Sequence, residues 1–333
     1  MFLDTVQDKA LHEQLHKARR ALPSDEPLRH VFRARHRALL TGRRAEEARQ
    51  TDAAWVEACP AYGEARRASA SGDLDLVESH GLRMALPRAT STTGFGARLR
   101  EGWLPWRDIL SQRELGVGTV MIDIGANIGT TSIVRVILGD VQRVYAIEPE
   151  PANFACLVHN IVANGLAGFV LPDASAISSR TGPGLLRQAS GLGAHRLLDD
   201  KAMRRGRRDS LPVPTWTLDD WVAHYGIDVP AVSLIKVDTQ GWESHVLAGA
   251  ARLLSAHHAA WVIEVSPRHL EAAGTPLARL IEQCQAHFTH AIDFRGEGSK
   301  ARVLPVAQLA EALAYLDAST DATYTNLLLY HAS

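Results

Sequence analysis

The chain has 333 residues, of which 46% are hydrophobic and 22% are charged, so it can bury a sizeable core and is not expected to be disordered. A formal net charge of −1 excludes the basic excess that is typical of proteins whose main partner is nucleic acid or an anionic membrane. The three cysteines, Cys59, Cys156 and Cys284, lie far apart and form no CxxC pair, which predicts neither a disulfide framework nor a zinc site.

Residues 1–72 are rich in Ala, Arg, Glu and Gln and poor in β-branched residues, which predicts a helical N-terminal extension. Apolar positions are sparse there, so these helices are candidates for packing on the main domain or on a second copy in a homodimer. The first 20 residues lack the apolar core of a signal peptide. No run approaches the ~18 apolar residues of a membrane span. We therefore expect a cytoplasmic protein with no membrane span.

Residues 73–117 are expected to form a hairpin followed by a connector. Residues 74–87 alternate in polarity around His80 and Gly81, which predicts a small β-hairpin. Trp103 and Trp106 lie in the connector and are candidates for a lid over a bound acceptor molecule, such as a sugar ring. The main domain is then expected to span residues 118–333.

From residue 119 onward, short apolar runs alternate with helical stretches, which is typical of βαβ units and a parallel sheet. Helices are predicted to begin at Pro151 and after Thr217, and both are preceded or opened by capping residues. Residues 180–212 hold Gly, Pro and a basic run at 201–208, and are predicted to be an insertion. The strands are predicted at residues 120–124, 143–147, 168–171, 232–237, 260–265, 288–294 and 324–330. The predicted fold is therefore α/β and Rossmann-like, with a seven-stranded, mostly parallel sheet and helices on both faces.

The most informative motif is Asp-Ile-Gly-Ala-Asn-Ile-Gly at residues 123–129, directly after a predicted strand. Gly125 permits a sharp turn and a close approach of a ligand to the backbone. Dinucleotide enzymes seat a pyrophosphate on G-x-G-x-x-G, whereas this loop reads G-x-x-x-G and carries Asp123 two positions before the first glycine. A carboxylate at that place suits a cationic or zwitterionic ligand such as S-adenosylmethionine. The alternative is a glycine turn in another kind of α/β protein.

Glu148 ends the second predicted strand, about 20 residues after the glycine loop. An acid at this place accepts hydrogen bonds from ribose hydroxyls in nucleoside-binding folds of this kind. Pro149 stiffens the turn that follows it. The alternative is a solvated carboxylate at a strand end. Together with the glycine loop, Glu148 indicates an adenosyl ligand.

The ordered set of motifs resembles the FkbM-type branch of class I S-adenosylmethionine-dependent methyltransferases. The resemblance implies a seven-stranded sheet with a reversed last strand, S-adenosylmethionine as methyl donor, and usually a hydroxyl as acceptor. This chain has Gln240 where the family commonly has Glu, which leaves any role of that position open. The resemblance covers about residues 115–265 and rests on residues 122–129, 146–149, 153–154, 217–220, 234–243, 246–250 and 262–265.

The resemblance also implies the donor-binding residues. The methionine end of the donor is expected at the glycine loop, the ribose at Glu148, and the adenine at Asp173 and Ala174 after the third strand. Pro149 and Asp238 are expected to complete the donor site. The glycine-loop residues expected to contact the donor are Asp123, Gly125, Ala126, Asn127, Gly129 and Thr130.

Methyl transfer to a hydroxyl needs alignment of the reacting atoms and a base for the proton. Three candidate bases lie at or just beyond strand ends: Asp238, His245 and Glu264. Asp238 is the first choice because it ends the fourth strand. His245 is alternatively a packed or solvated residue, and Glu264 is alternatively a structural acceptor. Lys236 is expected to pair with Asp238 or Glu264. No metal site is expected, because Asp238 and Glu264 alone are too few oxygen ligands.

The sequence therefore predicts an S-adenosylmethionine-dependent methyltransferase, with O-methylation of a sugar, glycan or natural-product hydroxyl as the expected reaction and N-methylation left open. One rival is an NAD-dependent oxidoreductase, which the G-x-x-x-G spacing and the missing Tyr-x-x-x-Lys set disfavour. A second rival is a non-catalytic S-adenosylmethionine-binding assembly protein. Neither nucleic acid nor a membrane is expected as a partner.

Overall fold

The computed structural model describes residues 74–88, 91–92, 94–105, 120–139, 141–188, 195–198, 210–256, 259–294, 302–316 and 324–331. Three predictions lie outside these residues: the helical N-terminal extension, a role of Trp106, and the basic run at 201–208. The fold described below is that of the remaining chain.

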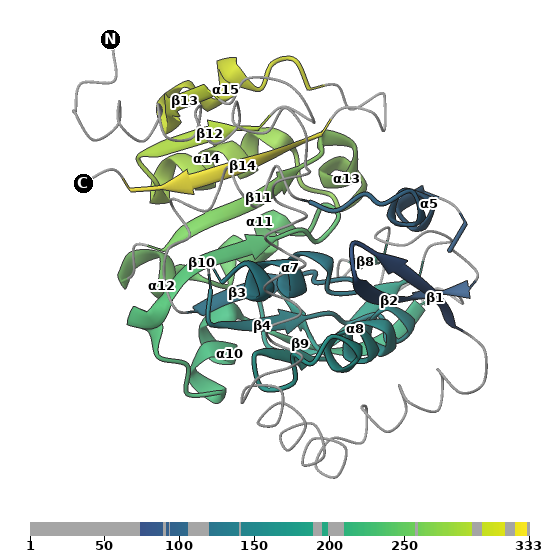
Figure 1. Ribbon diagram of the computed structural model, residues 1–333. Helices are drawn as coiled ribbons and strands as arrows, with labels where there is room; N and C mark the ends of the chain where they lie inside the picture. The colour runs from purple at the N-terminus through teal and green to yellow at the C-terminus, as the bar shows by residue number, and fades with distance from the viewer. Residues whose placement is uncertain are drawn as a thin grey trace.

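The centre of the described fold is an eight-stranded sheet in the order β13-β12-β14-β11-β10-β3-β4-β5 (Figure 1). Adjacent strands from β11 to β5 are parallel, whereas β14 runs antiparallel to both β11 and β12. The mostly parallel sheet and its reversed last strand are therefore confirmed. The strands are β3 (Val120–Ile124), β4 (Arg143–Ile147), β5 (Val170–Asp173), β10 (Val232–Val237), β11 (Ala260–Val265), β12 (His290–Asp293), β13 (Arg302–Pro305) and β14 (Thr325–Tyr330).

Two details of the predicted sheet are wrong. The described sheet has eight strands and not seven, because β13 pairs antiparallel with β12 at the edge. This strand is four residues long and ends in Pro305, and a strand with proline is tolerated at an edge. The third strand also begins two residues later than predicted, because Gly168 takes a left-handed turn with φ of 85° before β5. Asp173 is consequently the last residue of β5.

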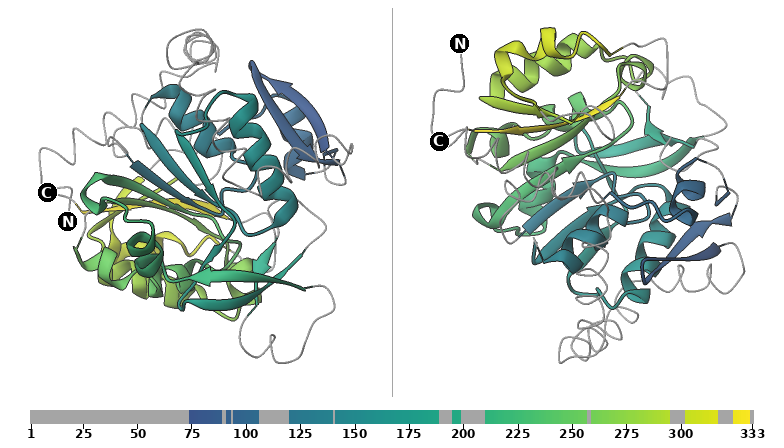
Figure 2. Two further views of the ribbon diagram at one scale, coloured as in Figure 1. Left: turned by 90° about the horizontal axis from the view of Figure 1, so that it is seen from below. Right: turned by 45° about the horizontal axis from the view of Figure 1, so that its top comes forward.

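Helices cover both faces of the sheet, as predicted (Figure 2). Buried apolar residues alternate along each strand, so that Met121 and Leu234 pack with α7 and α8 on one face. Ile122 and Ile235 pack on the other face, with the helices that follow β9. The helices are α5 (Gly94–Arg100), α7 (Thr130–Leu138), α8 (Pro151–Ala163), α10 (Leu218–His224), η2 (Val229–Ala231), α11 (Glu243–Ala248), α12 (Ala251–Ala256), α13 (Pro267–Ala272), α14 (Leu277–His287), η3 (Val306–Gln308) and α15 (Leu309–Ala312).

The capping signals read from the sequence are confirmed. Pro151 is the first residue of α8, and Glu150 caps the helix by accepting a hydrogen bond from the Asn153 N–H. Thr217 caps α10 by accepting from the Asp220 N–H. These caps fix the start of each helix directly after a strand and so determine where the strand-end residues lie.

The predicted hairpin is confirmed as β1 (Leu74–Ser79) and β2 (Leu82–Pro87), which pair antiparallel around His80 and Gly81. It lies against α8, where two asparagine side chains pair with the β2 backbone. Asn160 exchanges hydrogen bonds with the N–H and carbonyl of Ala85, and Asn164 does the same with Arg83. The side-chain amides of Asn160 and Asn164 thus hold the hairpin by bonding to backbone N–H and carbonyl groups of β2, as a neighbouring strand would.

The predicted insertion contributes to a second, smaller sheet in the order β6-β9-β7-β8. Its strands are β6 (Ala176–Ile177), β7 (Gly182–Arg187), β8 (Arg196–Leu197) and β9 (Ser210–Trp216).

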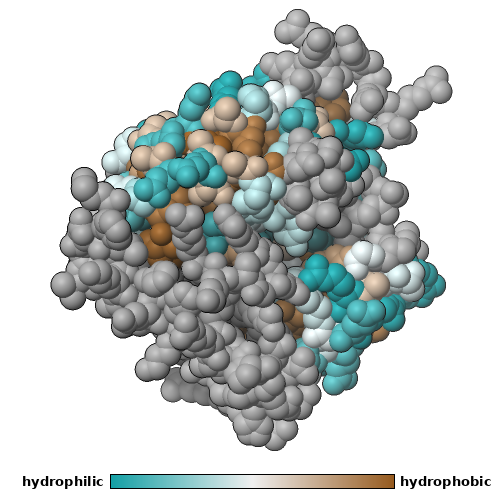
Figure 3. Space-filling model, turned by 90° about the horizontal axis from the view of Figure 1, so that it is seen from above, coloured by the Kyte–Doolittle hydropathy of each residue, from teal (hydrophilic) through white to brown (hydrophobic). Residues whose placement is uncertain are grey.

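On the face seen in Figure 3, hydrophobic residues show between hydrophilic ones across the described surface. None of the described helices is both long and apolar enough to cross a membrane.

Candidate functional site

The carboxyl ends of the central strands open into a cavity of about 290 Å³. The chain runs outward from β3 to β4 and β5, and then returns to place β10 on the opposite side of β3. Crevices for ligands form at such a reversal of strand order in open α/β sheets. The described residues that line the cavity are Phe95, Arg98, Trp103, Pro105, Ile124, Gly125, Ala126, Asn127, Thr130, Thr131, Ile147, Glu148, Pro149, Asn153, Ser175, Ala176, Ile177, Leu186, His195, Arg196, Leu197, Lys236, Asp238, Thr239, Gln240, Trp242, Glu264, Tyr324 and Asn326.

The glycine loop forms the floor of this cavity between β3 and α7. The N–H groups of Gly125 and Ala126 both donate to the Ile147 carbonyl, at 2.9 and 3.0 Å. Gly125 has φ of 79°, and a Cβ there would lie 1.9 Å from the Asp238 carbonyl oxygen. Glycine is therefore required at this position both by the backbone conformation and by the close approach of the chain after β10.

Glu148 stands beside the loop at the end of β4 and is buried. Its Oε2 accepts a hydrogen bond from the Asn127 N–H at 2.9 Å, and its Oε1 accepts from the Glu150 N–H at 2.9 Å. Burial raises the pKa of Glu148 to about 7, although both backbone hydrogen bonds lower it. Each oxygen keeps a lone pair, so the carboxylate can also accept hydrogen bonds from a pair of ligand hydroxyls.

Two further oxygen atoms in the loop are poised for a ligand. Asn127 Oδ1 and Thr130 Oγ1 are buried and make no hydrogen bond within the described residues. Both side chains line the cavity, and a buried polar atom without a partner is costly unless a ligand or water satisfies it. Carbonyl and hydroxyl oxygens at this place are suited to a ligand that donates hydrogen bonds, such as an ammonium group.

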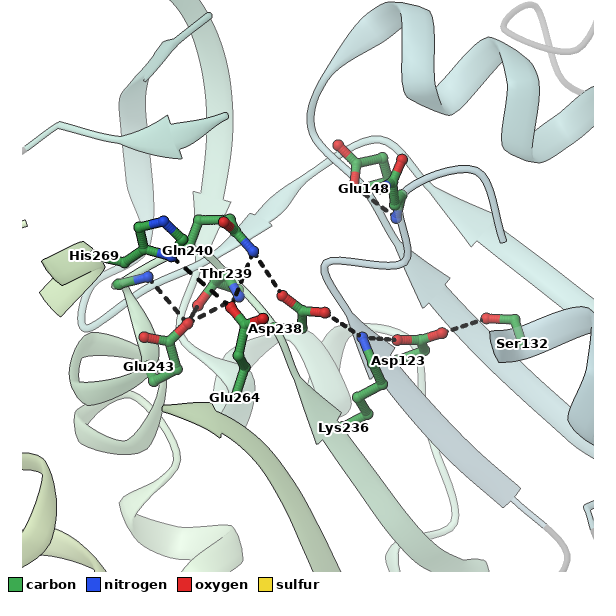
Figure 4. Close-up of polar contacts among 12 residues, drawn as sticks. Asp123, Ser132, Glu148, Lys236, Asp238, Thr239, Gln240, Glu243, Glu264 and His269 are labelled. Carbon is green, nitrogen blue, oxygen red and sulfur yellow. Dashed lines mark hydrogen bonds and ion pairs between the residues drawn. The ribbon is translucent and has the colours of Figure 1, made fainter. Parts of the chain in front are cut away.

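A network of polar side chains, which we call the polar chain, crosses the ends of β3, β10 and β11 (Figure 4). It consists of Asp123, Lys236, Asp238, Gln240 and Glu264. Asp123 and Lys236 are paired across the parallel register of β3 and β10 and therefore point to the same face. Lys236 Nζ lies 3.4 Å from Asp123 Oδ1 and 3.3 Å from Asp238 Oδ2. The predicted pairing of Lys236 with Asp238 is thus confirmed, with Asp123 as a second partner. Burial lowers the pKa of Lys236, but the two carboxylates raise it above its ordinary value.

Gln240 continues the polar chain toward β11. Its Nε2 donates to Asp238 Oδ1 and to Glu264 Oε2, each at 3.0 Å. Gln240 has a positive φ of 56°, an uncommon conformation that often marks functional sites. Burial, followed by the nearby carboxylates of Asp238 and Glu243, raises the pKa of Glu264 well above its ordinary value. Asp238 and Glu264 are therefore joined by one amide, and their carboxyl groups also interact with each other directly.

Glu243 fixes the loop that carries Gln240. Its Oε1 accepts hydrogen bonds from the N–H groups of Thr239 and Gly241, at 3.0 and 3.1 Å, and from the Thr239 hydroxyl. The Glu243 side chain is buried, and burial raises its pKa to about 7 despite these hydrogen bonds. A structural acid is thus kept partly protonated at neutral pH.

We expect the stability of the protein to fall as pH rises from about 5 to about 7, and Glu243→Gln to make this fall shallower. Over this window an unfolded glutamate has lost its proton whereas folded Glu243 retains it, so folding takes up a proton and is opposed by rising pH. The contribution of this one group is at most about 3 kcal/mol. Urea unfolding of both proteins across the window measures it. Equal slopes in the two proteins would contradict the assignment.

The cavity brings together most of the predicted site residues but not all. Gly125, Ala126, Asn127, Thr130, Glu148, Pro149, Lys236, Asp238 and Glu264 line it. The predicted residues that do not are Asp123, Gly129, Asp173, Ala174 and His245. Among the described residues, no group of three or more His, Cys, Asp or Glu side chains is placed to hold a metal ion.

Each residue outside the cavity has a structural reason for its place. Asp123 is fully buried behind Lys236, where it also accepts from the Ser132 hydroxyl at 2.6 Å. Gly129 makes the left-handed turn that precedes α7. His245 stacks on Trp242, with ring centroids 3.9 Å apart, and does not line the cavity. The carboxylate of Asp173 accepts from the Tyr225 hydroxyl and the Ser175 N–H, so Ser175 and the β6 residues line the cavity in its place.

Several lining residues were not predicted, because they come from distant segments. Phe95 and Arg98 lie on α5. Both pack on Trp103, the connector residue that the sequence suggested as part of a lid: its ring meets Phe95 edge-on at 5.4 Å, and the Arg98 guanidinium lies 4.4 Å from its centroid. Trp103 lines the cavity, and its role as a lid stays a prediction. Asn326 is paired with Glu264 across the antiparallel register of β14 and β11. Only the strand pairing brings this residue to the site, and no local motif marks it.

Comparison with known proteins gives a consistent picture. The family model described as "Methyltransferase FkbM domain" matches residues 123–303, which is more than half of the chain. The 31-O-demethyl-FK506 methyltransferase FkbM of Streptomyces tacrolimicus is 28% identical over 206 residues, which cover 53% of this chain and 76% of that protein.

Two solved structures were also compared. The structure of Methyltransferase FkbM from Methylobacillus flagellatus is 20% identical with a TM-score of 0.40. The match covers 72% of this chain and 47% of that chain, so this chain spans about half the length of that protein. The structure of M. jannaschii TYW2 in complex with AdoMet is 10% identical with a TM-score of 0.35, and the match covers 78% of this chain and 87% of that chain.

Proposed function

The chain belongs to the FkbM methyltransferase family, and from this premise we propose that it transfers a methyl group from S-adenosylmethionine to a hydroxyl oxygen of a sugar or secondary metabolite. The family match confirms the resemblance seen in the sequence. The observation that carries the donor assignment is the buried Glu148 carboxylate beside the glycine loop, held by the Asn127 N–H at 2.9 Å.

The residues present fit this donor. Glu148 has the oxygen atoms to accept both ribose hydroxyl protons, and the buried oxygens of Asn127 and Thr130 suit the ammonium group. Ile147, Pro149 and Ile177 offer apolar surface for the adenine. When bound, S-adenosylmethionine supplies a methyl group on a sulfonium, which leaves as a neutral thioether. The predicted donor residues that lie outside the cavity act by supporting those that line it.

The part of the cavity that we assign to the acceptor is lined by aromatic side chains and by polar side chains. Phe95 and Trp103 present ring surface, whereas Asp238, Gln240 and Glu264 present hydrogen-bonding groups. Apolar surface with a few placed polar groups suits a ring that carries hydroxyls. The name of the Streptomyces relative assigns that protein a 31-O-demethyl-FK506 acceptor, which supports an oxygen acceptor here.

The donor assignment is tested by thermal unfolding with S-adenosylmethionine, S-adenosylhomocysteine and NAD, because stabilisation follows affinity. We expect stabilisation by the first two ligands, and stabilisation by NAD alone would favour the oxidoreductase. The reaction is tested with methyl-labelled donor and a panel of sugars and natural products, read by mass spectrometry. Label on an amine and not on a hydroxyl would show N-methylation. Binding without transfer to any acceptor would favour the non-catalytic assembly protein.

We expect Asp238→Asn to leave donor binding within about threefold of wild type but to slow methyl transfer by about 100-fold. The amide removes the charge that pairs with Lys236 at the acceptor end of the cavity, whereas the Glu148 contacts to the ribose remain. Calorimetry with S-adenosylmethionine and single-turnover transfer from labelled donor separate the two effects. Unchanged transfer would remove Asp238 from the reaction.

A further inference from the structure

We infer that His269 transfers the proton released in this reaction to solvent. Glu264 takes the proton of the acceptor hydroxyl, and His269 receives it from Glu264 and passes it to water. This inference rests on the proposed methyl transfer to a hydroxyl. It adds a residue that no sequence motif marks and that does not line the cavity.

The placement of His269 carries the inference. Its Nδ1 lies 4.0 Å from Glu264 Oε2 (Figure 4). Nδ1 itself is buried, yet 35% of the side chain is exposed, so the exposed surface belongs to other atoms of the side chain. Glu264 in turn lines the cavity. The two side chains therefore form a short path from the cavity to the surface of the protein.

The backbone holds this path in place. His269 lies in α13, which begins two residues after β11 ends and three residues after Glu264. The start of α13 packs on Gly241, where a Cβ would lie 2.1 Å from the His269 carbonyl oxygen. Gly241, with φ of 102°, is followed by the loop anchor Glu243. Backbone packing between α13 and Gly241 therefore fixes the position of His269 relative to the acids.

The surroundings of Glu264 select it over Asp238 as the group that takes up the proton. Asp238 is held in an ion pair with Lys236, at 3.3 Å. Glu264 instead faces two acids, Asp238 and Glu243. Burial and these two carboxylates raise its pKa, and Lys236 lowers it only in part. Two carboxylates whose surroundings differ in this way divide the roles of fixed charge and proton carrier.

Gln240 lies between the two acids and bonds to both. Its Nε2 group donates hydrogen bonds to Asp238 Oδ1 and to Glu264 Oε2. The amide cannot accept a proton from either acid, so protons do not pass through it under ordinary conditions. The Nε2 atom faces both acids, because two carboxylates next to the carbonyl oxygen would repel it. His269 is then the titratable group next to Glu264 on the side away from Gln240.

The acceptor oxygen forms a bond to the methyl carbon as the carbon–sulfur bond breaks, and the electron pair of that bond stays on sulfur. The hydroxyl proton moves to a Glu264 carboxylate oxygen and then to the lone pair of neutral His269 Nδ1. The imidazolium releases its Nε2 proton to water, which leaves the Nδ1–H tautomer. A ring flip or tautomerisation then returns the lone pair to Nδ1 before the next turnover. The 4.0 Å gap closes by a small rotation, as catalytic hydrogen bonds often do on ligand binding.

The test is an NMR titration of the His269 ring, assigned with His269→Gln, in the full-length protein with S-adenosylhomocysteine. In Glu264→Gln we expect the His269 titration to move down by about one pH unit, because a facing carboxylate favours the imidazolium. The matched control is Glu271→Gln, which removes an exposed acid from α13 itself and should leave the titration in place. An identical His269 titration in wild type and Glu264→Gln overturns the inference.

A kinetic experiment addresses the proton path itself. With an acceptor from the panel, His269→Ala should lower kcat about tenfold or more without changing donor affinity. Added imidazole should restore part of the lost rate, a response that a purely structural histidine would not give. A His269→Ala enzyme with wild-type kcat, or one that imidazole does not rescue, overturns the path. If no acceptor is methylated, the proposed function fails, whereas the titration still decides whether Glu264 and His269 interact.

Discussion

Replacing Gly125 with alanine is expected to destabilise the protein by about 3 kcal/mol or more and to abolish donor binding. The new Cβ would lie 1.9 Å from the Asp238 carbonyl oxygen, a backbone atom that cannot rotate away. Relief requires a shift of the chain after β10, whose Asp238 N–H donates to the Ile124 carbonyl at 3.0 Å. The φ of 79° adds further strain for any residue with a side chain.

Gly226→Ala is the matched control for this substitution. Gly226 also has a positive φ, of 59°, but a Cβ there meets nothing within 4 Å. It should therefore show only the conformational cost of about 1 kcal/mol. Urea unfolding and calorimetry with S-adenosylmethionine measure both variants. If the two substitutions cost the same stability and both leave donor binding intact, the close approach of β3 and β10 does not constrain the loop.

Glu148→Ala is expected to weaken S-adenosylmethionine binding by about 100-fold. Hydrogen bonds to a charged acceptor are worth about 1.5–3 kcal/mol each, and the carboxylate can accept one from each ribose hydroxyl. The change also leaves the Asn127 and Glu150 N–H groups without their acceptor, which loosens the glycine loop. A loss of about 3 kcal/mol corresponds to roughly two orders of magnitude in affinity. Calorimetric titration with donor measures the effect.

Two controls accompany this substitution. Glu148→Gln keeps one carbonyl oxygen as acceptor and should retain part of the affinity. Glu150→Gln changes the neighbouring buried acid, which caps α8 and does not line the cavity, and should bind the donor within about threefold of wild type. Wild-type affinity in Glu148→Ala would remove the central observation on which the donor assignment rests.

The sheet and the glycine loop could be predicted because their signals are local. A buried strand, a glycine loop and a helix follow one another within residues 120–138, and Glu148 is marked by its place at the end of the next strand. The third strand was misplaced by two residues because a single glycine turn at Gly168 shifts its start. The edge strand β13 carries too few residues for a pattern to be recognised.

The parts of the site that were missed depend on contacts between distant segments. The sequence places Asp123 in the loop motif. In the strand, however, its side chain lies on the same face of the sheet as Met121, where it is paired with Lys236. Lys236 is more than 100 residues away, so no local pattern reveals this pairing. Asn326 and His269 reach Glu264 through strand pairing and helix packing. Tertiary structure alone supplies these neighbours.

The side chain of Asn160 ties two regions of the molecule into one cooperative unit. Besides pairing with Ala85 in the hairpin, its Nδ2 donates to the Ile128 carbonyl in the glycine loop at 2.9 Å. Because one amide satisfies both, the free energy of docking the hairpin and that of ordering the loop are linked, and such linkage is reciprocal. The hairpin, although remote from the cavity in sequence, is therefore part of what preorganises the glycine loop.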